Sequence, residues 1–582
     1  MPRPLLSTAM RSRSVGFTAR ARILSACFVL AALLLSVRLY FVQIVHGEEH
    51  RREAEGQYVA RASDVEERAD IFMSEREGAL VAVAMTRGGW RLVLAPRDIE
   101  NPQALYEALS RHASLDEKRF FASAAKADDP YEEIAFKLDD DTAALIRKEK
   151  LPGVTLVRDQ WRYYPGNSLA AHMVGFVGYK GDTKAGVYGL ESFWQGTLAK
   201  ISSGLYVNPF AELFMNMSAA LSSDPGEGYG DIITSIEPSV EARLESVLRE
   251  VRETYAPKFS AGIVMDPKTG EIIAMAVDPT FDLNTYSTVE NAEIFANPLV
   301  ENIYEMGSIM KPLTIAAGID AGAITPKTTY NDKGCIEKSG KTICNHDKKA
   351  RGVVDIQEVL NQSLNLGASF VADTMGHNVF GEYIHAFGLG EKTGIDLPNE
   401  ARGKIHAIDH GYDVDYASAS FGQSIAMTAI GMIRGLGVLA NGGVLPSPHV
   451  VQGVRLESGI VRTITPEKGA RALKEETVET VNAMLVKVFD EALLDGILKQ
   501  EHYSIAAKTG TAQIAIPGGG GYYADRYLHS FFGYFPAHEP RFIVFLIAVE
   551  PKGVQYASAS LARPFLDITK FLINYYNIPP DR

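Results

Sequence analysis

The chain has 582 residues, of which 46% are hydrophobic and 22% charged, and its formal net charge is -13 at pH 7. That length allows two or three domains, and that composition is typical of a folded globular protein and excludes a disordered one. The net negative charge, with no basic stripe to offset it, argues against a nucleic-acid-binding protein.

The N-terminal 22 residues contain five arginines and no acidic residue, and residues 23–45 then form an apolar run, ILSACFVLAALLLSVRLYFVQIV. A helix of that length spans about 35 Å, which is enough to cross a bilayer. The basic charge before the run and the acidic GEEH after it orient the N-terminus toward the cytoplasm. A cleaved signal peptide would have a shorter apolar core and a small-x-small cleavage site, which we do not find. We therefore expect a cytoplasmic tail at 1–22 and an uncleaved transmembrane signal anchor at 23–45.

From residue 46 to about residue 228, short apolar runs alternate with charged stretches such as DDD at Asp139–Asp141. We interpret these charges as solvated faces, because the spacing of a calcium-binding loop is absent. The glycine-rich segment DPGEGYGD at Asp224–Asp231 is the best candidate for a domain boundary. The chain is therefore expected to contain one domain at 46–228 and another at 229–582.

The second predicted domain mixes strands and helices. Ala261–Val277 has two β-type runs joined by Asp-Pro-Lys-Thr-Gly, which is typical of a hairpin. FFGYFP and Arg541–Glu550 predict further strands. A helical pattern runs from Tyr416 to a stop at Asn-Gly-Gly, and Leu561–Tyr576 predicts a final helix. Helices combined with antiparallel strands make this domain α+β.

Two of the three cysteines flank the sequence CIEKSGKTIC, at Cys335 and Cys344. A two-residue turn at Ser339–Gly340 would place them opposite each other as a non-hydrogen-bonded pair, whose separation suits a disulfide. An oxidising compartment would permit that bridge. Lys338 would then face Lys341, which disfavours this register, so two free thiols on a surface hairpin stay open as the alternative.

The tripeptide Lys-Thr-Gly occurs three times, at Lys268–Gly270, Lys392–Gly394 and Lys508–Gly510. The first copy lies in the predicted hairpin turn, and the second lies in a Gly- and Pro-rich connection, so both are interpreted as loops. The third copy follows YSIA and precedes TAQIAI, which places it at the end of a β-strand or inside one. Whether this third copy has a catalytic function has to be decided from motifs elsewhere in the chain.

A nucleophilic serine needs a base within reach, and Ser-x-x-Lys on a helix supplies one because residues i and i+3 share a face. SAAK at Ser123–Lys126 lies in a polar region and is interpreted as accidental. SIMK at Ser308–Lys311 begins an apolar helix, in which Pro312 is tolerated only if the helix starts close to Ser308. A helix N-terminus favours a developing oxyanion. Lys311 must be neutral to act as a base, and burial and a second cation would both lower its pKa.

Ser-x-Asn occurs once, as SLN at Ser363–Asn365. A helix break there could present a hydroxyl for proton relay and an amide that holds a peptide. The order SxxK, SxN and KTG is the signature of penicillin-binding proteins and class A β-lactamases. Of the three KTG copies, only Lys508–Gly510 both follows SLN at a distance and lies on a predicted strand.

With these motifs the chain resembles class B penicillin-binding proteins, which are monofunctional peptidoglycan DD-transpeptidases. WRYYPGNSLAAHMVGFVG at Trp161–Gly178, with GVYGLE at Gly186–Glu191, resembles the R-x-Y-P…AAH…G segment of the family's pedestal. MDPKTGEIIAMAVDP, GLGEKTGIDLP, ANGG and KTGTAQ match further family blocks. The resemblance covers most of residues 20–575. It implies a penicillin-binding transpeptidase (serine β-lactamase-like) domain, preceded by an elongated α/β pedestal of dimerisation type and a single transmembrane helix.

The sequence departs from the family pattern in several places. Met306 stands where a proline usually precedes Gly307, and Leu364 is bulkier than the usual middle residue of SxN. Ala69 and Ser74 replace usual family residues in the pedestal, and residues 201–223 match no family block that we recognise. Every side chain that the family uses for acylation is nevertheless present.

The resemblance implies a two-step acyl transfer carried by five catalytic residues. Ser308 would attack the penultimate D-alanine carbonyl of a donor stem peptide and release the terminal D-alanine. Lys311 would be the base, and Ser363 would relay the proton to the leaving amine. Asn365 would bind the donor backbone, and Lys508 would supply positive potential. An amine from a second stem peptide would then resolve the acyl-enzyme and close the cross-link.

Three further residues are implied in substrate binding. Thr509 and Thr511 would hold the donor carboxylate, and Gly510 would let the substrate approach the sheet edge because it has no Cβ. The backbone N–H groups of Ser308 and Thr511 would form the oxyanion hole. No metal or cofactor is implied, because the 13 histidines show no His-Glu-x-x-His or paired ligand spacing.

The resemblance also implies partners and a location. The partners would be D-Ala-D-Ala stem peptides, β-lactams bound covalently at Ser308, a SEDS-type glycan polymerase, other divisome or elongasome membrane proteins, and the membrane itself. No nucleic acid is expected. The chain would cross the bacterial inner (cytoplasmic) membrane once, with its N-terminus inside and its catalytic domain on the periplasmic (extracytoplasmic) side.

Other functions stay open beside cell-wall cross-linking. A DD-carboxypeptidase and a β-lactam-sensing or β-lactam-hydrolysing relative share the motifs, but the large pedestal disfavours both. A non-catalytic scaffold that recruits wall-synthesis partners is the alternative from a different class. Between septal synthesis in cell division and sidewall elongation in cell shape, the overall length and the pedestal favour division.

Overall fold

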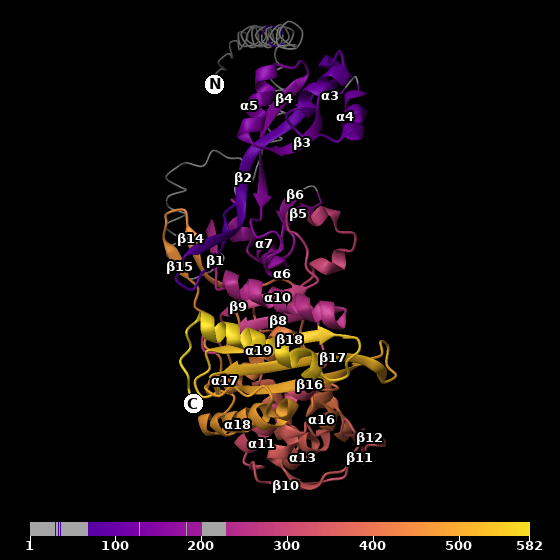
Figure 1. Ribbon diagram of the computed structural model, residues 1–582, viewed down its shortest axis with the longest axis vertical. Helices are drawn as coiled ribbons and strands as arrows, with labels where there is room; N and C mark the ends of the chain where they lie inside the picture. The colour runs from indigo at the N-terminus through magenta and orange to yellow at the C-terminus, as the bar shows by residue number, and fades with distance from the viewer. Residues whose placement is uncertain are drawn as a thin grey trace, which may run out of the picture. The chain divides into compact units, whose positions relative to one another are not determined.

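The computed structural model describes residues 68–126, 129–181, 183–200 and 228–582, together with Leu30, Leu33 and Leu35. The chain divides into two compact units, one that contains Gly88–Trp161 and a larger one that contains Glu66–Arg87 and Arg162–Arg582. In Figure 1 the smaller unit holds the elements labelled α3, α4, α5, β3 and β4.

The predicted anchor at 23–45 lies outside the described residues except for Leu30, Leu33 and Leu35, which are helical and exposed. Across the described ranges, no helix combines the length and the apolar character that crossing a membrane requires. Residues 201–223 and the start of the glycine-rich boundary segment also lie outside the described residues.

In the smaller unit, helices and strands pack around one apolar core. Its elements are the C-terminal part of β2 (Leu80–Leu94), η2 (Pro96–Asp98), α3 (Pro102–Ser110), α4 (Glu117–Ala124), β3 (Glu132–Leu138), α5 (Asp140–Glu149) and β4 (Val154–Tyr163). Asn101, Asp116 and Asp139 each accept a backbone N–H from the first turn of a helix. These caps satisfy donors that have no intrahelical partner, so they set where the three helices begin. The core is built from Leu92, Leu94, Leu105, Leu109, Phe120 and Ile146.

The larger unit begins with a sheet whose strands come from distant parts of the chain. The strands are β1 (Ile71–Ser74), the N-terminal part of β2, β7 (Gly230–Thr234), β14 (Val451–Leu456) and β15 (Val461–Thr463), in the order β15-β14-β7-β1-β2. β1 and β7 are parallel, and the other neighbours are antiparallel. The neighbouring short elements are α6 (Ala171–Val174), β5 (Val177–Lys180), β6 (Thr183–Gly186), α7 (Gly189–Phe193) and α8 (Gln195–Leu198).

A buried ionic cluster explains the polar residues of two pedestal motifs in this unit. The Glu191 carboxylate is fully buried and accepts hydrogen bonds from Arg68 Nε at 2.5 Å and Arg162 Nε at 2.6 Å. The Tyr164 hydroxyl lies 3.4 Å from the same carboxylate and accepts the backbone N–H of Val177 at 3.0 Å. Because a buried charge is tolerated only when it is paired, these motif residues stabilise one another.

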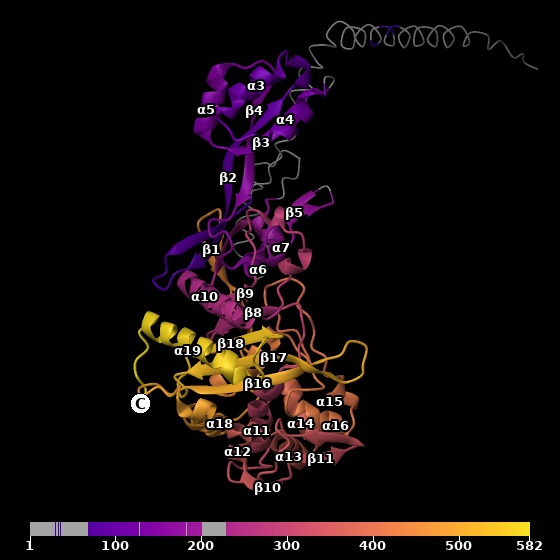
Figure 2. The ribbon, with the colours of Figure 1, turned by 45° about the vertical axis from the view of Figure 1, so that its right-hand side comes forward.

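The centre of the larger unit is a five-stranded antiparallel sheet in the order β16-β17-β18-β8-β9. Its strands are β8 (Phe259–Met265), β9 (Ile272–Asp278), β16 (Ala506–Ala515), β17 (Tyr522–Phe535) and β18 (Phe542–Val549). α10 (Pro238–Tyr255) and α19 (Ala557–Tyr575) share one apolar cluster with residues of the sheet. Figures 1 and 2 show these two helices on one side of the sheet and a helical region on the other.

The helical region contains most of the remaining elements. Its helices are α11 (Lys311–Asp320), α12 (Ile356–Asn361), α13 (Asn365–Met375), α14 (His377–Ala386), α15 (His406–His410), α16 (Asp413–Ala419), α17 (Ala429–Ala440) and α18 (Glu475–Lys487). Two ribbons accompany them, β10 (Thr329–Asp332) with β13 (Gly352–Asp355), and β11 (Cys335–Lys338) with β12 (Lys341–Cys344). Short helical turns at η5 (Gly307–Met310), η6 (Val488–Ala492) and η7 (Leu493–Gly496) complete the region. Two further turns, η3 (Tyr286–Thr288) and η4 (Ala292–Phe295), instead pack against Phe176, between α6 and β5. The α+β prediction is confirmed for this domain.

The three Lys-Thr-Gly copies lie where the sequence predicts. Lys268–Gly270 forms the turn between β8 and β9, with Gly270 at φ 85°. Lys392–Gly394 lies outside helices and strands, and Lys508–Gly510 lies inside β16. The third copy therefore differs from the other two in its secondary structure.

The predicted continuous helix from Tyr416 is wrong in its middle. α16 ends at Ala419 and α17 begins at Ala429, and the residues between them form turns and isolated bridges to Tyr304 and Lys404. Gly422 has φ 83°, which a helix does not allow. Backbone pairing with Tyr304 and Lys404 therefore prevents a helix here, although the spacing of apolar residues in the sequence is that of a helix.

The β11–β12 hairpin has the predicted register. Cys335 pairs with Cys344 and the two form a disulfide, so the alternative of two free thiols is excluded. The turn at Ser339–Gly340 has positive φ at both residues, as tight hairpin turns require. Lys338 does face Lys341, but Lys338 forms an ion pair with Asp373, which relieves the expected repulsion.

Candidate active site

The structure brings the eight predicted site residues together around one cleft of about 1010 Å³. Ser308 lies in η5, directly before α11, and Lys311 is the first residue of α11. Ser363 occupies the break between α12 and α13, and Asn365 begins α13. Five of these eight residues line the cleft: Ser308, Ser363, Asn365, Thr509 and Thr511. The other three, Lys311, Lys508 and Gly510, are buried beside it.

Lys311 connects the two serines. Its Nζ lies 2.9 Å from Ser308 Oγ, 2.6 Å from the carbonyl oxygen of Ser363 and 3.1 Å from Ser363 Oγ. The side chain is completely buried, and this burial, with the neighbouring charge of Lys508, holds its pKa well below the usual 10.5. A neutral amine has two hydrogens for Ser363 and one lone pair, which can accept the Ser308 proton. Lys311 can therefore accept a proton from Ser308.

Lys508 extends the same hydrogen-bonded chain. Its Nζ donates to Ser363 Oγ at 3.1 Å and to the carbonyl oxygen of Thr509 at 3.1 Å. Ser363 thus lies between two lysines, and it has φ 54°, a left-handed conformation that is uncommon for serine. Burial lowers the pKa of Lys508 to about 7, so its charge changes with pH near neutrality.

The two threonines of the KTG-T segment face the cleft because side chains alternate along β16. Thr511 Oγ1 accepts the backbone N–H of Ala557, the first residue of α19, at 3.1 Å. Since its lone pair is used in this way, the Thr511 hydroxyl keeps its hydrogen for an anion in the cleft. Thr509, two residues earlier, lies on the same face of the strand.

Gly510 is also required for the packing of the protein itself. A Cβ at this position would lie 2.3 Å from Ser530 Oγ and 2.7 Å from the carbonyl oxygen of Met306. The missing side chain therefore lets the turn that contains Ser308 approach the strand. Gly422 plays a similar part, because a Cβ there would lie 2.2 Å from the carbonyl oxygen of Gly307. Close packing around Ser308 is therefore one requirement that both positions meet, and the approach of a substrate to the sheet edge at Gly510 stays a prediction.

Asn365 is positioned by the disulfide hairpin. Its side-chain amide donates to the carbonyl oxygen of Cys344 at 2.9 Å. That bond leaves its second N–H and its own carbonyl oxygen for a peptide backbone. The hairpin thus contributes to the orientation of a predicted substrate-binding group.

Glu305, which the sequence reasoning missed, also helps to shape the cleft. Its carboxylate accepts the backbone N–H of Ser424 at 3.1 Å and the hydroxyl of Tyr522 at 3.2 Å, and burial raises its pKa. Ser424 and Tyr522 both line the cleft. The one available signal was its place three residues before the proposed nucleophile.

Comparison with known proteins agrees with this geometry. The chain matches the model of the penicillin binding protein transpeptidase domain over residues 261–570, which is more than half of its length. The chain belongs to this penicillin-binding transpeptidase family. Residues 67–199 match a second model, the penicillin-binding protein dimerisation domain.

Relatives of this family member resemble it over most of their length. Stage V sporulation protein D of Bacillus subtilis is 27% identical over 94% of this chain and 84% of its own. The peptidoglycan D,D-transpeptidase FtsI of Escherichia coli K12 is 25% identical over 77% and 73%, respectively. The crystal structure of apo penicillin-binding protein 3 from Mycobacterium tuberculosis has a TM-score of 0.64 at 26% identity, over 73% of this chain and 92% of that one. Penicillin-binding protein 2X of Streptococcus thermophilus, at 19% identity, shares the fold with a TM-score of 0.71 over 88% and 80%.

Proposed function

We propose that the chain is a peptidoglycan DD-transpeptidase that cross-links stem peptides through an acyl-enzyme on Ser308. The observation that carries this proposal is the continuous chain of contacts from Ser308 through Lys311 and Ser363 to Lys508 at the wall of one cleft. Relatives named peptidoglycan D,D-transpeptidase support the same reaction.

In the acylation step, Ser308 Oγ attacks the carbonyl of the penultimate D-alanine while its proton moves to neutral Lys311. Collapse of the tetrahedral intermediate breaks the C–N bond, and a proton reaches the leaving amine from Lys311 through the Ser363 hydroxyl, so terminal D-alanine departs neutral at nitrogen. The backbone N–H groups of Ser308 and Thr511 stabilise the oxyanion. Because the pKa of Lys311 is lowered, the amine is available as a base at neutral pH.

The donor is oriented by groups on both walls of the cleft. Thr509, Thr511 and protonated Lys508 bind its terminal carboxylate, and Asn365 binds its backbone. An amine of a second stem peptide then attacks the acyl carbonyl and releases Ser308, which closes the cross-link. A β-lactam acylates the same serine, and its ring-opened product keeps the leaving group attached, so the acyl-enzyme is long-lived.

We further infer how the chain is placed in the cell. Residues 1–22 form a cytoplasmic tail and 23–45 a single-pass anchor, with the non-catalytic region 46–228 and the catalytic region 229–582 outside the cytoplasm. The apolar run at 23–45, the basic residues before it and the Cys335–Cys344 bridge support this arrangement. A SEDS-type glycan polymerase is the partner expected for the anchor and pedestal, and relatives named FtsI favour a role in septal synthesis.

The proposal is tested by the lifetime of the penicillin adduct. Intact mass after incubation with benzylpenicillin should show one penicilloyl group per chain, on the peptide that contains Ser308, and it should persist for hours. Rapid loss of the adduct with continued penicillin turnover would instead identify a β-lactamase. A D-Ala-D-Ala peptide supplied with an acceptor amine should yield the transpeptidation product, whereas hydrolysis alone would indicate a carboxypeptidase.

The three KTG lysines give a matched comparison. Lys508→Ala should slow acylation by benzylpenicillin about 10- to 150-fold, because a charged hydrogen bond to the carboxylate is lost. Lys268→Ala and Lys392→Ala, at exposed lysines in loops, should leave the rate unchanged. The measurement is the second-order acylation rate with a fluorescent penicillin, and equal effects at all three positions would contradict the assignment.

The pH dependence of the same rate reports on Lys508. Its pKa of about 7 in the free protein means that raising the pH above 7 removes the cation that attracts the carboxylate. The wild-type rate at low ligand concentration should therefore fall as the pH rises from 7 to 9, and Lys508→Ala should lack this fall. A bound carboxylate raises the pKa of Lys508, so saturating ligand should shift the fall to higher pH.

A further inference from the structure

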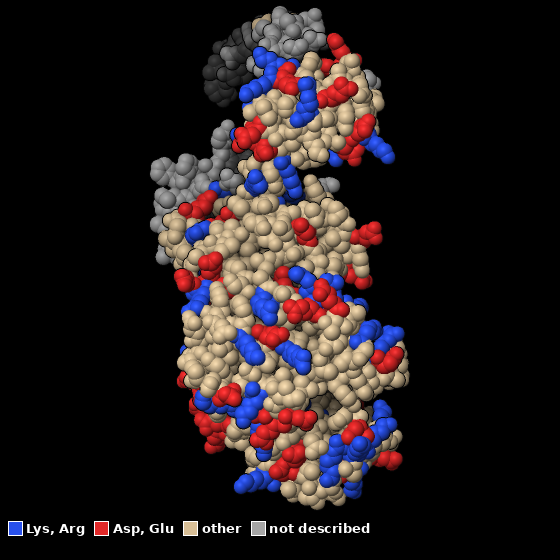
Figure 3. Space-filling view, viewed as in Figure 1, with Lys and Arg blue, Asp and Glu red and all other residues tan. Residues whose placement is uncertain are grey.

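The β11–β12 hairpin and the residues that follow it form one wall of the cleft. Lys341, His346 and Lys348 line the cleft together with Ser308 and Asn365. Figure 3 shows Lys and Arg side chains gathering at the lower right of the view, over β11 and β12, on a chain whose net charge is -13. This wall is the feature of the cleft that the acyl-transfer chemistry leaves unused.

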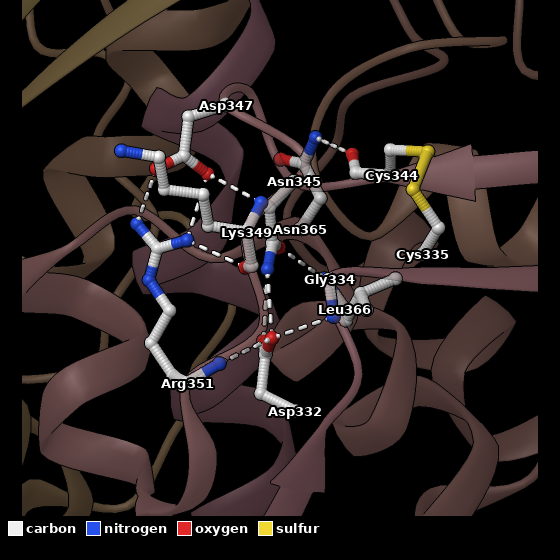
Figure 4. Close-up of a disulfide and its surroundings, with 10 residues drawn as sticks. All are labelled: Asp332, Gly334, Cys335, Cys344, Asn345, Asp347, Lys349, Arg351, Asn365 and Leu366. Carbon is white, nitrogen blue, oxygen red and sulfur yellow. Dashed lines mark hydrogen bonds and ion pairs between the residues drawn. A yellow bond between two sulfur atoms is a disulfide. The ribbon is translucent and has the colours of Figure 1, made fainter.

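Buried hydrogen bonds fix the β11–β12 hairpin to the start of α13, where Asn365 lies (Figure 4). The Asp332 carboxylate, 1% exposed, accepts the side-chain amide of Asn345 at 2.9 Å, and Asn345 Oδ1 accepts the backbone N–H of Leu366 at 3.2 Å. The disulfide closes the hairpin, and Asn365 binds the carbonyl oxygen of Cys344. The backbone of this hairpin therefore keeps a set position relative to Asn365.

Two of the cations on the wall are not neutralised within the described part of the chain. Lys338 pairs with Asp373 and Arg351 pairs with Asp347, but Lys341 and Lys348 form no ion pair there and are exposed. Holding two such charges beside a cleft is favourable when an anion occupies it.

The carboxylates near this wall do not cancel its charge. Asp415 is the one carboxylate that lines the cleft among the described residues, and it accepts the backbone N–H of Tyr412 at 2.9 Å. Glu337 lies on the opposite face of the ribbon from Lys341, because it pairs with Thr342 and side chains alternate along a strand. The side of the cleft at the hairpin is therefore cationic.

We propose that Lys341 and Lys348 form a subsite for side carboxylates of the donor stem peptide, on the residues that precede its terminal D-Ala-D-Ala. This inference rests on the proposed function and specifies its substrate: a stem peptide whose internal carboxylates are free and not amidated. The donor's terminal carboxylate lies at Thr509 and Thr511, and its backbone contacts Asn365. Because Asn365 is bonded to Cys344 of the hairpin, the upstream residues of the donor come next to this wall.

The test uses pairs of ester-terminated stem-peptide analogues that differ only in whether the internal carboxylates are free or amidated. Acyl-enzyme formation on the full chain is followed by intact mass. The free-acid donor should acylate wild type about three- to tenfold faster than its amidated twin, as expected for two partly exposed charge pairs. Raising the salt from about 0.1 M to about 1 M should erase this preference, because the Debye length shortens from about 10 Å to about 3 Å.

Variants with the same change of charge supply the control. Lys341→Gln combined with Lys348→Gln should abolish the preference, whereas Lys333→Gln combined with Lys349→Gln, exposed but not lining the cleft, should retain it. If the donor analogues form no acyl-enzyme, their binding is compared instead, by how strongly each one slows acylation of the protein by fluorescent penicillin. Equal rates for both donors, or faster reaction of the amidated one, would overturn the subsite.

Failure of this inference is distinguishable from failure of the proposed function. Benzylpenicillin lacks the upstream peptide, so all three proteins, wild type and the two double variants, should still be acylated by it. Normal penicillin acylation without donor preference refutes the subsite alone. Absence of penicillin acylation in wild type refutes the proposed function itself.

Discussion

Ser308→Ala is expected to abolish covalent labelling by penicillin while leaving the fold intact. No other hydroxyl in the cleft has a neutral lysine amine held below 3 Å from its oxygen in the described residues, so no second nucleophile can replace it. The variant keeps the groups that bind the carboxylate, so it should still bind penicillin reversibly. Intact mass spectrometry reports the adduct, and a thermal melt reports the fold.

The second Ser-x-x-Lys provides the matched control for that variant. Ser123 lies in the last turn of α4 and its hydroxyl donates to Glu132 at 2.7 Å, while Lys126 pairs with the same carboxylate. Ser123→Ala should therefore leave acylation unchanged. In cells that depend on this chain, Ser123→Ala should support growth and Ser308→Ala should not. Full rescue by Ser308→Ala would favour a non-catalytic scaffold.

Lys311→Met is expected to reduce the acylation rate by about 10²- to 10⁴-fold, the usual contribution of a positioned general base. Methionine fits a buried apolar position and keeps most of the volume, so Ser308 should remain in place. The second-order rate with a fluorescent penicillin at pH 7 to 9 measures the loss. A rate within threefold of wild type would show that another group accepts the Ser308 proton.

The same substitution should change how stability depends on pH. The pKa of Lys311 in the folded chain lies well below its usual 10.5, so unfolding takes up a proton between these two values. Stability from this residue therefore rises with pH across that window and is lost as the pH falls toward the folded pKa. The gain in stability of Lys311→Met over wild type should therefore be larger at pH 7 than at pH 10. Thermal unfolding of both proteins at the two pH values checks the sign.

The chemistry of the site could be predicted from sequence because it depends on side-chain type, order and local secondary structure. SxxK needs only a helical start, which Pro312 indicates, and the strand around Lys508 is readable from its neighbours. The hairpin register was also predictable, since a two-residue turn with glycine fixes it within a few residues. The resemblance to a family indicated a role for each site residue, but it did not indicate how these residues are arranged in space.

What could not be predicted depends on contacts between distant segments. The break between α16 and α17 follows from bridges to Tyr304 and Lys404, which no local sequence pattern predicts. The reason for Gly510 lies in the approach of Met306, two hundred residues earlier in the chain. The role of the hairpin as a wall of the cleft likewise requires the bond between Asn365 and Cys344 to be seen.

The close packing of backbone at Gly422, Gly307 and Gly510 has a consequence for drug resistance. Any side chain added at Gly422 or Gly510 would collide with backbone that holds the nucleophile, so a mutant that excludes an inhibitor there would also displace Ser308. Resistance to β-lactams is therefore not expected to arise by substitution at either of these two glycines.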